Sequence, residues 1–560
     1  MKKLFLFVLI FTAFLLFSSQ SRNNQQQVPQ VPFSKGVNFT FWFGYAKNAL
    51  GINPARYTEQ DFEDIKRLGF DVIRLPIDFS LYSSGAPNYI IDPHLFRLLD
   101  NAVDLAEKFQ LYIILDNHPG SVPLTGSNIR NVLLPIWRQV AEHYKNRSEY
   151  VIYEIMNEPN GISNNDWGRI QGDVINAIRR IDPNRWIVVG GSNYNSIDDM
   201  ISLPRYTDKK LLYTFHFYDP SIFTHQETNF VAQYKHLTAL IRGIPFPYDR
   251  NRMPEVPNEL KGTYYEEAYK NYSREGTPEA LIKQIDKAAN FARQRNVPVF
   301  NGEIGVPWRQ TVKEDRLMWY RTVIGAFKER NIPWLNWGYF EAFGLFNPQI
   351  DSLFFDNFWG DINTDLNVDL IRVFGLNPVP QRKREMQRSG FSIYDDAPGR
   401  GVIYYYFPPL NTINWYYTPA AEGRYAIHLG NLKRYEGMEL QLPVMDLTFL
   451  AQNGYVLEFK ARTERAFTFD IILMSFQDNI NWFNSYRIDQ RQLPPDGKWH
   501  TIRVPLRDML LYGGYDKDFN YVDARGRSIS WTNINMLRIS AEHQDGSVHD
   551  LFLDSIKVIR

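Results

Sequence analysis

Two short segments of this sequence each end an apolar, strand-like run with a carboxylate. Residues 155–159 contain Asn157 and Glu158, and residues 300–305 contain Glu303. Cleaving the acetal bond between two sugars requires one carboxyl group that donates a proton to the leaving oxygen and a second that stays ionised. The pair therefore indicates a glycosidase. An Asn-Glu-Pro triplet alone is as often an ordinary strand end, so the surrounding elements must decide.

Eight apolar stretches in the first two thirds of the chain are predicted to be strands. Each is continuously apolar rather than alternating, which is typical of strands buried on both faces. They are residues 36–41, 72–76, 112–116, 150–157, 186–190, 211–217, 297–303 and 334–339. Helix patterns lie between them, and eight strands with intervening helices predict a (β/α)8 barrel, a TIM barrel, over residues 31–376.

The clearest helix pattern begins after Thr58, with Asp61 three positions on, and stops at Gly69. This order gives a capping signal, an apolar stripe and a glycine stop. The alternation of strands and helices is interrupted between the sixth and seventh strands, where residues 244–248 are rich in Pro and Tyr. We expect a long loop excursion at the barrel mouth there, or equally a surface ornament without substrate contact, followed by a helix over residues 278–294.

Polar and aromatic side chains stand at the ends of most of these strands. Catalytic groups of a (β/α)8 barrel come from the C-terminal strand ends, so these residues should converge on one mouth. They are Arg74, His118, Asn157, Glu158, His216, Tyr218, Glu303 and Trp337. Singly each has a structural alternative, such as a surface ion pair for Arg74, a core histidine for His216 and barrel packing for Trp337. Together they predict one active site.

In residue types, strand assignments and order, this set resembles the active-site signature of glycoside hydrolase family 5. The resemblance covers the whole first domain, and residues 72–76 and 115–118 also resemble strand endings of that family. It implies a (β/α)8 barrel that acts on β-linked glycans. It further implies Glu303 as the nucleophile, kept ionised by Arg74 and Tyr218, and Glu158 as the acid/base with the higher pKa.

The resemblance gives the remaining side chains positioning roles. Asn157 would bind the 2-hydroxyl of the reacting sugar. His118 and His216 would orient the substrate and the acid/base, and the Trp337 ring would lie under the reacting sugar. Retention of configuration follows if the two carboxyl groups lie about 5 Å apart. The two histidines and two glutamates could instead converge on a metal, but no His-Glu-x-x-His spacing or Cys/His cluster is present, so no cofactor or metal is expected.

Substrate choice depends on weaker signals. Aromatic residues near strand ends are candidate stacking platforms for further sugars, or equally packing residues: Trp42, Tyr45, Trp137 and Trp308. Residues 216–220 and 223–226 resemble those of bacterial cellulase-type members, which favours an endo-β-1,4-glucanase. The alternatives within the family are a mannanase, another β-glycosidase, or an exo-acting or transglycosylating enzyme. An alternative of another class is a catalytically inactive barrel that binds polysaccharide.

A different pattern begins after a predicted last barrel helix, residues 364–374. Residues 377–392 are predicted to be a linker whose basic run, 381–388, is a solvated connector. Period-two strands then predict a β-sandwich over residues 393–560, similar to jelly-roll carbohydrate-binding modules. We expect either sugar stacking there or a structural domain that packs on the barrel. The candidate stacking aromatics are Trp415, Tyr416, Trp482 and Phe483.

Composition limits the partners and the compartment. The chain has 62 basic and 62 acidic residues, which argues against nucleic acid or an anionic membrane and favours a neutral, β-linked polysaccharide. Lys2 and Lys3 precede an apolar run over residues 4–17, so residues 1–20 are predicted to be a signal peptide. The run is short for a bilayer span, although an uncleaved anchor is the alternative. We expect a secreted or periplasmic monomer without disulfides, since the chain has no Cys.

Overall fold

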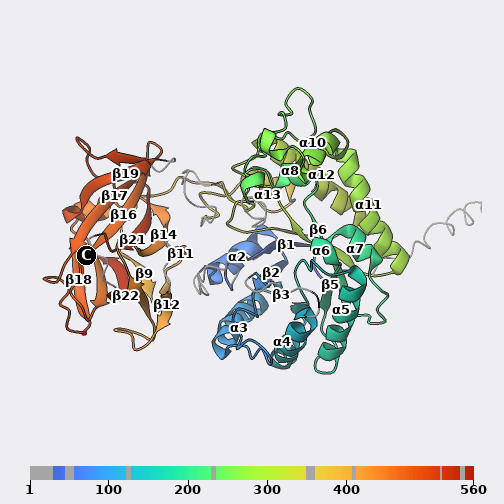
Figure 1. The fold of residues 1–560 in the computed structure, drawn as a ribbon, viewed down its shortest axis with the longest axis horizontal. Coiled ribbons are helices and arrows are strands. Elements are labelled where there is room, and N and C mark those ends of the chain that lie inside the picture. The colour runs from blue at the N-terminus through green and yellow to red at the C-terminus, as the bar shows by residue number, and fades with distance from the viewer. Residues whose placement is uncertain are drawn as a thin grey trace, which may run out of the picture.

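The computed structural model has a helical barrel and an all-β part, drawn at the right and left of Figure 1. It describes residues 30–43, 56–120, 126, 128–228, 235–347, 360–405, 412–516, 520–542 and 549–560. The predicted signal peptide and Tyr45 lie outside these residues. Within the described ranges, no helix combines the length and the apolar character that a membrane span requires.

The barrel is closed by eight parallel strands in sequence order, with β1 paired to β8. They are β1 (Lys35–Asn38), β2 (Val72–Ile77), β3 (Tyr112–Asn117), β4 (Val151–Glu154), β5 (Ile187–Gly190), β6 (Leu211–Phe217), β7 (Val299–Ile304) and β8 (Trp334–Asn336). Each overlaps a predicted strand. Continuous apolar character was thus a reliable guide, because helices cover the outside while side chains fill the inside. The predicted (β/α)8 fold is confirmed.

Helices surround the barrel and return the chain from one strand to the next. They are α2 (Glu59–Leu68), α3 (Pro93–Lys108), α4 (Asn128–Tyr144), α5 (Asn164–Arg179), α6 (Ser192–Asn195), α7 (Ile197–Ser202), α11 (Pro278–Arg295), α12 (Lys313–Arg330) and α13 (Val368–Val373). The predicted capping signals of α2 are present: Thr58 and Asp61 form a capping box, and Gly69 ends the helix with a left-handed φ of 98°.

The predicted last barrel helix was placed too early, at residue 364. In the structure α13 starts four residues later, because the Asn367 side chain caps it by accepting a hydrogen bond from the Leu370 amide. The Asn367 amide in turn donates to the Leu345 carbonyl at 2.9 Å. This bond holds the chain before the helix against the segment that follows β8.

The segment between β6 and α11 is more ordered than the sequence suggested. Its described part holds α8 (Ser221–Thr224), α9 (Lys235–Thr238), a 3-10 turn η1 (Asn258–Leu260) and α10 (Tyr264–Glu275). Ile244, Phe246 and Tyr272 are buried in the barrel's hydrophobic core. The Tyr272 hydroxyl also donates to the Pro245 carbonyl at 2.6 Å. The expected structureless excursion is therefore wrong for the described residues: its Pro- and Tyr-rich stretch is packed core.

The C-terminal part consists of two antiparallel sheets. One contains β9 (Phe391–Asp395), β10 (Ala397–Pro398), β12 (Thr412–Tyr417), β13 (Ala426–Leu432), β15 (Val456–Arg462), β18 (His500–Pro505) and β22 (His549–Ile559). The other contains β11 (Ile403–Tyr405), β14 (Gly437–Met445), β16 (Phe469–Gln477), β17 (Ile480–Ile488), β19 (Leu510–Asp516), β20 (Tyr521–Asp523) and β21 (Ile534–Ser540). One buried cluster, including Leu429 and Leu473, joins the two sheets, which makes this part a β-sandwich.

The sandwich contacts the barrel through charged and aromatic side chains. Arg400 lies 3.8 Å from Asp61 and 3.7 Å from Asp64, two largely buried carboxylates of α2, and Figure 1 shows α2 on the side of the barrel that faces the sandwich. The ring of Tyr416 in β12 packs edge-on against His94 of α3, with 4.8 Å between centroids. Tyr416 is therefore an interface residue, not a sugar platform.

The connecting segment is hydrogen-bonded to both the barrel and the sandwich. Arg384 lies 2.6 Å from the buried Asp365 carboxylate on the barrel side, and its guanidinium donates to the Val444 carbonyl of the sandwich at 2.6 Å. The expectation of a merely solvated connector is therefore wrong at Arg384. A guanidinium has five N–H donors, so one side chain can bridge two partners in this way.

Three of the four aromatics proposed for sugar stacking in the sandwich are covered. Trp415 and Trp482 are 3% and 4% exposed, and Arg527 stands over the Trp482 ring at 4.7 Å. Tyr416 and Phe483 are both partly exposed, but Tyr416 packs against the barrel at the interface, whereas Phe483 packs against Met474 and two neighbouring buried side chains. The prediction failed because residue type cannot show which face of a strand a ring occupies.

Candidate active site

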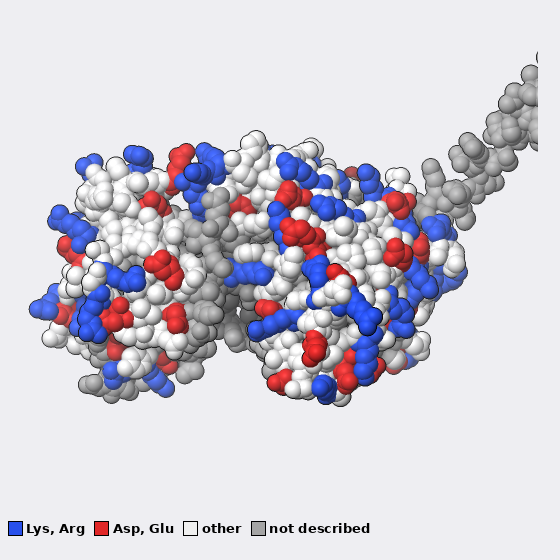
Figure 2. All heavy atoms as spheres, turned by 90° about the horizontal axis from the view of Figure 1, so that it is seen from above, with Lys and Arg blue, Asp and Glu red and all other residues white. Residues whose placement is uncertain are grey.

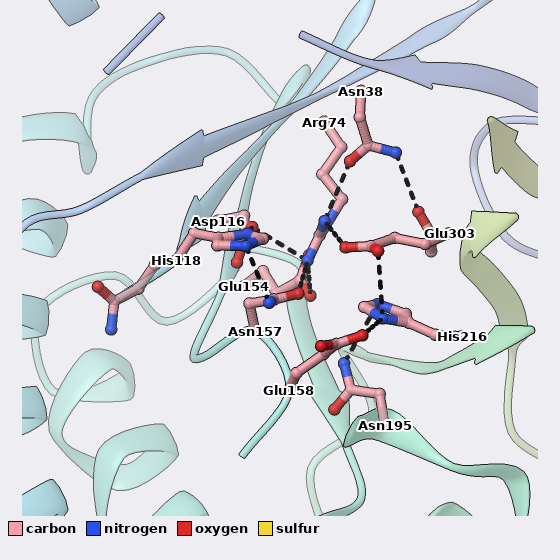
Figure 3. A network of polar contacts seen from close by, with 12 residues as sticks. Asn38, Arg74, Asp116, His118, Glu154, Asn157, Glu158, Asn195, His216 and Glu303 are labelled. Atoms are coloured by element: carbon pink, nitrogen blue, oxygen red, sulfur yellow. Dashed lines mark hydrogen bonds and ion pairs between the residues drawn. The ribbon is translucent and has the colours of Figure 1, made fainter. Parts of the chain in front are cut away.

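A single buried guanidinium organises the polar residues at the C-terminal ends of the strands (Figure 3). Arg74 of β2 is fully buried, and its nitrogens lie 2.7 Å from both Glu154 and Glu303 and 3.0 Å from Asp116. It also donates to the Asn157 side-chain oxygen at 2.8 Å. Burying a charge is costly unless its hydrogen bonds are satisfied, and here the partners come from three other strands or their ends.

Sequence reasoning missed two of these partners, Asp116 and Glu154. Both carboxylates are almost fully buried, and burial raises the pKa of Asp116 to about 7 and the pKa of Glu154 above its usual value, while Arg74 opposes both shifts. A signal was available. Each is a carboxylate within or at the end of a strand that is buried on both faces, which requires a cationic partner nearby.

His118 and Asn157 form one chain of hydrogen bonds with Asp116. The Nδ1 of His118 lies 2.8 Å from Asp116 Oδ2, and its Nε2 lies 3.0 Å from the Asn157 amide nitrogen. Because Asn157 Oδ1 accepts from Arg74, its nitrogen must face His118, which places the imidazole proton on Nδ1. Burial and then Arg74 lower the pKa of His118 to about 4, so this ring is neutral.

Glu158 follows β4 with a left-handed φ of 42°, which is uncommon for a residue with a side chain. Its Oε1 lies 2.7 Å from Nδ1 of His216, and its side chain is 28% exposed, the most accessible carboxylate of the group. Burial raises the pKa of Glu158 to about 7, against the opposing effects of His118 and Arg74. This carboxyl can therefore hold a proton near neutral pH.

Both oxygens of Glu303 accept a hydrogen bond. Arg74 donates to Oε1 at 2.7 Å, and the Tyr218 hydroxyl donates to Oε2 at 2.9 Å. Burial raises the pKa of Glu303, while His216 and Arg74 act in the opposite direction and favour the charged form. One oxygen of Glu303 and one of Glu158 lie within 4.8 Å of each other, so the two carboxyl groups share one small space.

Trp337 lies at the edge of this space, after the end of β8. It is 9% exposed, clusters with Tyr218, Ala342 and Phe343, and its ring lies 5.7 Å from that of His118 in a stacked arrangement. His225 of the β6–α11 segment packs against Tyr218, with ring centroids 5.0 Å apart. Part of that segment therefore supports the site.

Two predicted sugar platforms are core residues. Trp42 is 1% exposed and packs among Phe39, Tyr57 and Phe62 in the barrel core. Trp137 is fully buried, and its indole donates to the Ile155 carbonyl at 2.9 Å. Both predictions are corrected for the same reason, since these rings point between barrel and helices.

The half-buried Trp308 remains a candidate sugar platform. It follows β7, and the guanidinium of Arg309 lies 4.7 Å from its ring. Two further residues at the mouth were missed by sequence reasoning, Asn38 beside Arg74 and Asn195 beside His216.

Glu158, His216 and Glu303 could present one metal-ligating atom each within 4.8 Å of one another. These side chains are engaged otherwise, because His216 Nδ1 is hydrogen-bonded to Glu158, and Arg74 and Tyr218 each donate to one oxygen of Glu303. A divalent cation there would have to break the first bond and sit beside a guanidinium charge. The donor set therefore fits proton transfer and nucleophilic attack better than metal binding.

A closed (β/α)8 barrel whose mouth holds two carboxyl groups at the ends of β4 and β7 is typical of the class of barrel glycoside hydrolases. The comparison with known families agrees. Residues 34–342, more than half of the chain, match the family described as cellulase, glycosyl hydrolase family 5. The chain belongs to this family of glycoside hydrolases.

Several of its relatives carry endoglucanase names. Endoglucanase 3 of Fibrobacter succinogenes is 29% identical over 348 residues, which are 58% of this chain but only 52% of that protein. Endoglucanase C of Acetivibrio thermocellus is 28% identical over 321 residues, covering 55% of this chain and 92% of that protein. Among solved structures, the cellulose synthase subunit Z of Clostridioides difficile is 25% identical, covers 61% of this chain and 99% of that one, and has a TM-score of 0.47.

Proposed function

We propose that this protein is a retaining endo-β-1,4-glucanase in which Glu303 is the nucleophile and Glu158 the acid/base. The observation that carries the proposal is the spacing of at most 4.8 Å between an oxygen of each carboxylate. Retaining enzymes hold their carboxyl groups about 5–5.5 Å apart, whereas inverting enzymes need about 6.5–9.5 Å to admit a water molecule. The endoglucanase names of the relatives support the choice of β-1,4-glucan.

The first half of the reaction uses the different surroundings of the two carboxylates. Glu303, with a donor on each oxygen, attacks the anomeric carbon. The bond to the glycosidic oxygen breaks, and Glu158 passes its proton to that oxygen so that the leaving sugar departs neutral. The product is a glycosyl ester on Glu303.

The second half reverses the role of Glu158. As a carboxylate it removes a proton from water, the water oxygen attacks the anomeric carbon, and the ester bond to Glu303 breaks. Two inversions give net retention. Asn157 has one amide hydrogen directed to His118 and a second that is available for the 2-hydroxyl of the sugar, where a hydrogen bond strengthens in the transition state.

The test uses soluble β-glucans and mannans with wild type, Glu158→Gln and Glu303→Gln. We expect wild type to cut a β-1,4-glucan into mixed oligomers whose new ends keep the β-configuration by NMR, and both variants to lose this activity. Glu158→Ala with azide and 2,4-dinitrophenyl β-cellobioside should yield a β-glycosyl azide, because that leaving group departs without a proton and azide needs no general base. Mannan cleavage, or one product size, would replace the glucanase proposal by a mannanase or an exo-acting enzyme.

The same experiment tests the alternative class. Binding of a glucan without release of reducing ends would identify a catalytically inactive polysaccharide-binding barrel. Undiminished activity of Glu303→Gln would mean that the nucleophile is another residue.

We further propose that residues 393–560 act mainly as a fixed structural domain and that residues 1–20 direct export. The contacts of Tyr416 and Arg400 with the barrel support the first proposal. If wild type and a Phe483→Ala variant are retained equally on insoluble cellulose, the structural role of residues 393–560 is supported. Loss of retention in the variant alone would favour a sugar-binding module.

A further inference from the structure

Asn195 lies under the active site in an unusual stretch of backbone after β5. Asn193, Tyr194 and Asn195 have φ angles of 56°, 61° and 53°, in the left-handed region that few residues with side chains adopt. Asn195 is fully buried, and a Cβ on Gly190 would come within 2.7 Å of its side-chain oxygen. The position of the Asn195 side-chain amide therefore requires local backbone strain and a glycine at position 190.

The amide nitrogen of Asn195 lies 3.3 Å from Nε2 of His216 (Figure 3). The other ring nitrogen, Nδ1, lies 2.7 Å from Glu158 and 3.5 Å from Glu303. An ionised carboxylate only accepts hydrogen bonds, so Nδ1 must carry the proton whenever Glu158 is charged. The bare Nε2 then needs a donor, and the Asn195 amide supplies it.

We propose that Asn195 is a positioning residue that holds His216 in its Nδ1–H tautomer and so determines which oxygen of Glu158 carries the transferable proton. The inference rests on the proposed role of Glu158 as acid/base. With Nδ1–H always donating to Oε1, that oxygen is an acceptor in both protonation states of Glu158. The proton is therefore kept on Oε2, the oxygen that is not turned toward His216.

The surroundings of His216 keep its ring neutral, so its hydrogen-bond partners determine the tautomer and not the charge. The ring is buried, and desolvation lowers its pKa to about 4, although the carboxylates nearby act against this shift. The ionisable groups that face it are Glu303, Glu158, Arg74, Glu154 and His118. A neutral imidazole has one N–H, which either nitrogen can carry, so the second partner decides.

Ring nitrogen NMR of uniformly ¹⁵N-labelled protein reads the tautomer without any substrate. The chain has 10 histidines, and His216→Gln identifies the signals of this one. We expect the Nδ1–H form in wild type. In Asn195→Asp, a carboxylate of the same shape accepts at Nε2, and we expect the Nε2–H form or the imidazolium. An Nε2–H form in wild type would overturn the proposal.

Kinetics test the consequence for Glu158. Asn195→Ala should lower kcat/KM on β-glucan by about 10- to 100-fold, a part of what general acid catalysis contributes. It should change kcat/KM on 2,4-dinitrophenyl β-cellobioside by less than about 3-fold, because that leaving group departs without a proton. In Asn195→Asp an imidazolium beside Glu158 favours its charged form, so the basic limb of the pH profile should move to lower pH.

Asn193→Ala is the matched control, because it has the same left-handed backbone and is exposed. It should retain activity on both substrates. Equal losses of Asn195→Ala on both substrates, with the ring spectrum unchanged, would reduce Asn195 to a structural residue. If wild type cleaves no glycan, the proposed function fails, and the ring spectrum still decides the tautomer.

Discussion

At the scale of single residues, Arg74 carries both stability and chemistry. It neutralises carboxylates that cannot reach water, and with His216 it favours the charged form of Glu303, whose pKa burial raises. The same side chain therefore positions Glu303, the proposed nucleophile, and compensates for the burial of Asp116 and Glu154. Removing it leaves uncompensated charges inside the barrel, which costs more than the loss of the contacts themselves.

We predict that Arg74→Met lowers the free energy of unfolding by about 3–5 kcal/mol, as is typical when one partner of a buried ion pair is removed. The matched control is Arg130→Met. Arg130 lies 2.7 Å from Asp173, as close as Arg74 lies to Glu303, but both side chains are about half exposed. We expect a change below about 1 kcal/mol there. Urea denaturation of both variants measures the difference, and equal losses would contradict the burial argument.

A second prediction at this scale concerns pH. As the proposed general acid, Glu158 must be protonated to expel the leaving sugar, and burial raises the pKa of Glu158 to about 7. The value of kcat/KM on β-glucan should therefore fall as pH rises through about 7, tenfold for each further pH unit. It should also fall in acid, as Glu303 becomes protonated. On 2,4-dinitrophenyl β-cellobioside the basic limb should be absent, and a limb that persists there would belong to another group.

Residue types predicted the paired carboxylates and their neighbours because each follows a strand whose boundaries are visible in the sequence. They did not predict Asn195, which acts only through the fold of residues 192–195, nor the burial of Trp42 and Trp137. An indole serves equally well in a core and in a sugar site. The direction of its side chain depends on packing that lies far away in sequence.

At the scale of elements, some helices and strands are determined by local sequence signals and others by tertiary contacts. The strands and α2 were predictable because apolar runs, a capping box and a C-terminal glycine are local. The β6–α11 segment was not, because two of its helices, α8 and α9, have only four residues each. The segment is also buried through aromatic residues such as Phe246 and Tyr272, which the sequence cannot distinguish from loop residues. The start of α13 depends on the single cap Asn367.

The cap of α2 gives a prediction at this scale. Gly69→Ala should destabilise the protein by about 1–2 kcal/mol, because φ of 98° is unfavourable for a residue with a Cβ. Gly325 in α12 is the control: a Cβ there would meet no atom within 4 Å, so Gly325→Ala should stabilise by about 0.5–1 kcal/mol. Thermal unfolding of the two variants should shift in opposite directions, and a shared direction would refute the argument.

At the scale of the whole molecule, charge is balanced over both parts. In the view of Figure 2 acidic and basic side chains are interspersed on barrel and sandwich alike, in keeping with 62 residues of each sign. The contacts between the parts are instead local and specific. Arg400 meets two carboxylates that burial makes less acidic than usual, with the pKa of Asp61 at about 6.

We predict that Arg400→Glu weakens the docking of sandwich on barrel, because a third carboxylate would face Asp61 and Asp64. Calorimetry should then resolve two transitions in place of one, and proteases should cut between residues 381 and 390. Arg525→Glu carries the same charge change in an exposed turn after β20, with 90% of its side chain accessible. It should leave both readouts as in wild type. Identical behaviour of the two variants would mean that Arg400 does not hold the parts together.

The double attachment of Arg384 also bears on how such a protein can evolve. Modules joined by loose tethers are readily exchanged when genes recombine between them. A crossover between residues 376 and 391 here would separate Arg384 from Asp365 or Val444, and Arg400 from its two carboxylates. The recombinant would inherit buried charges without partners. We therefore expect barrel and sandwich to be passed on together as one heritable unit.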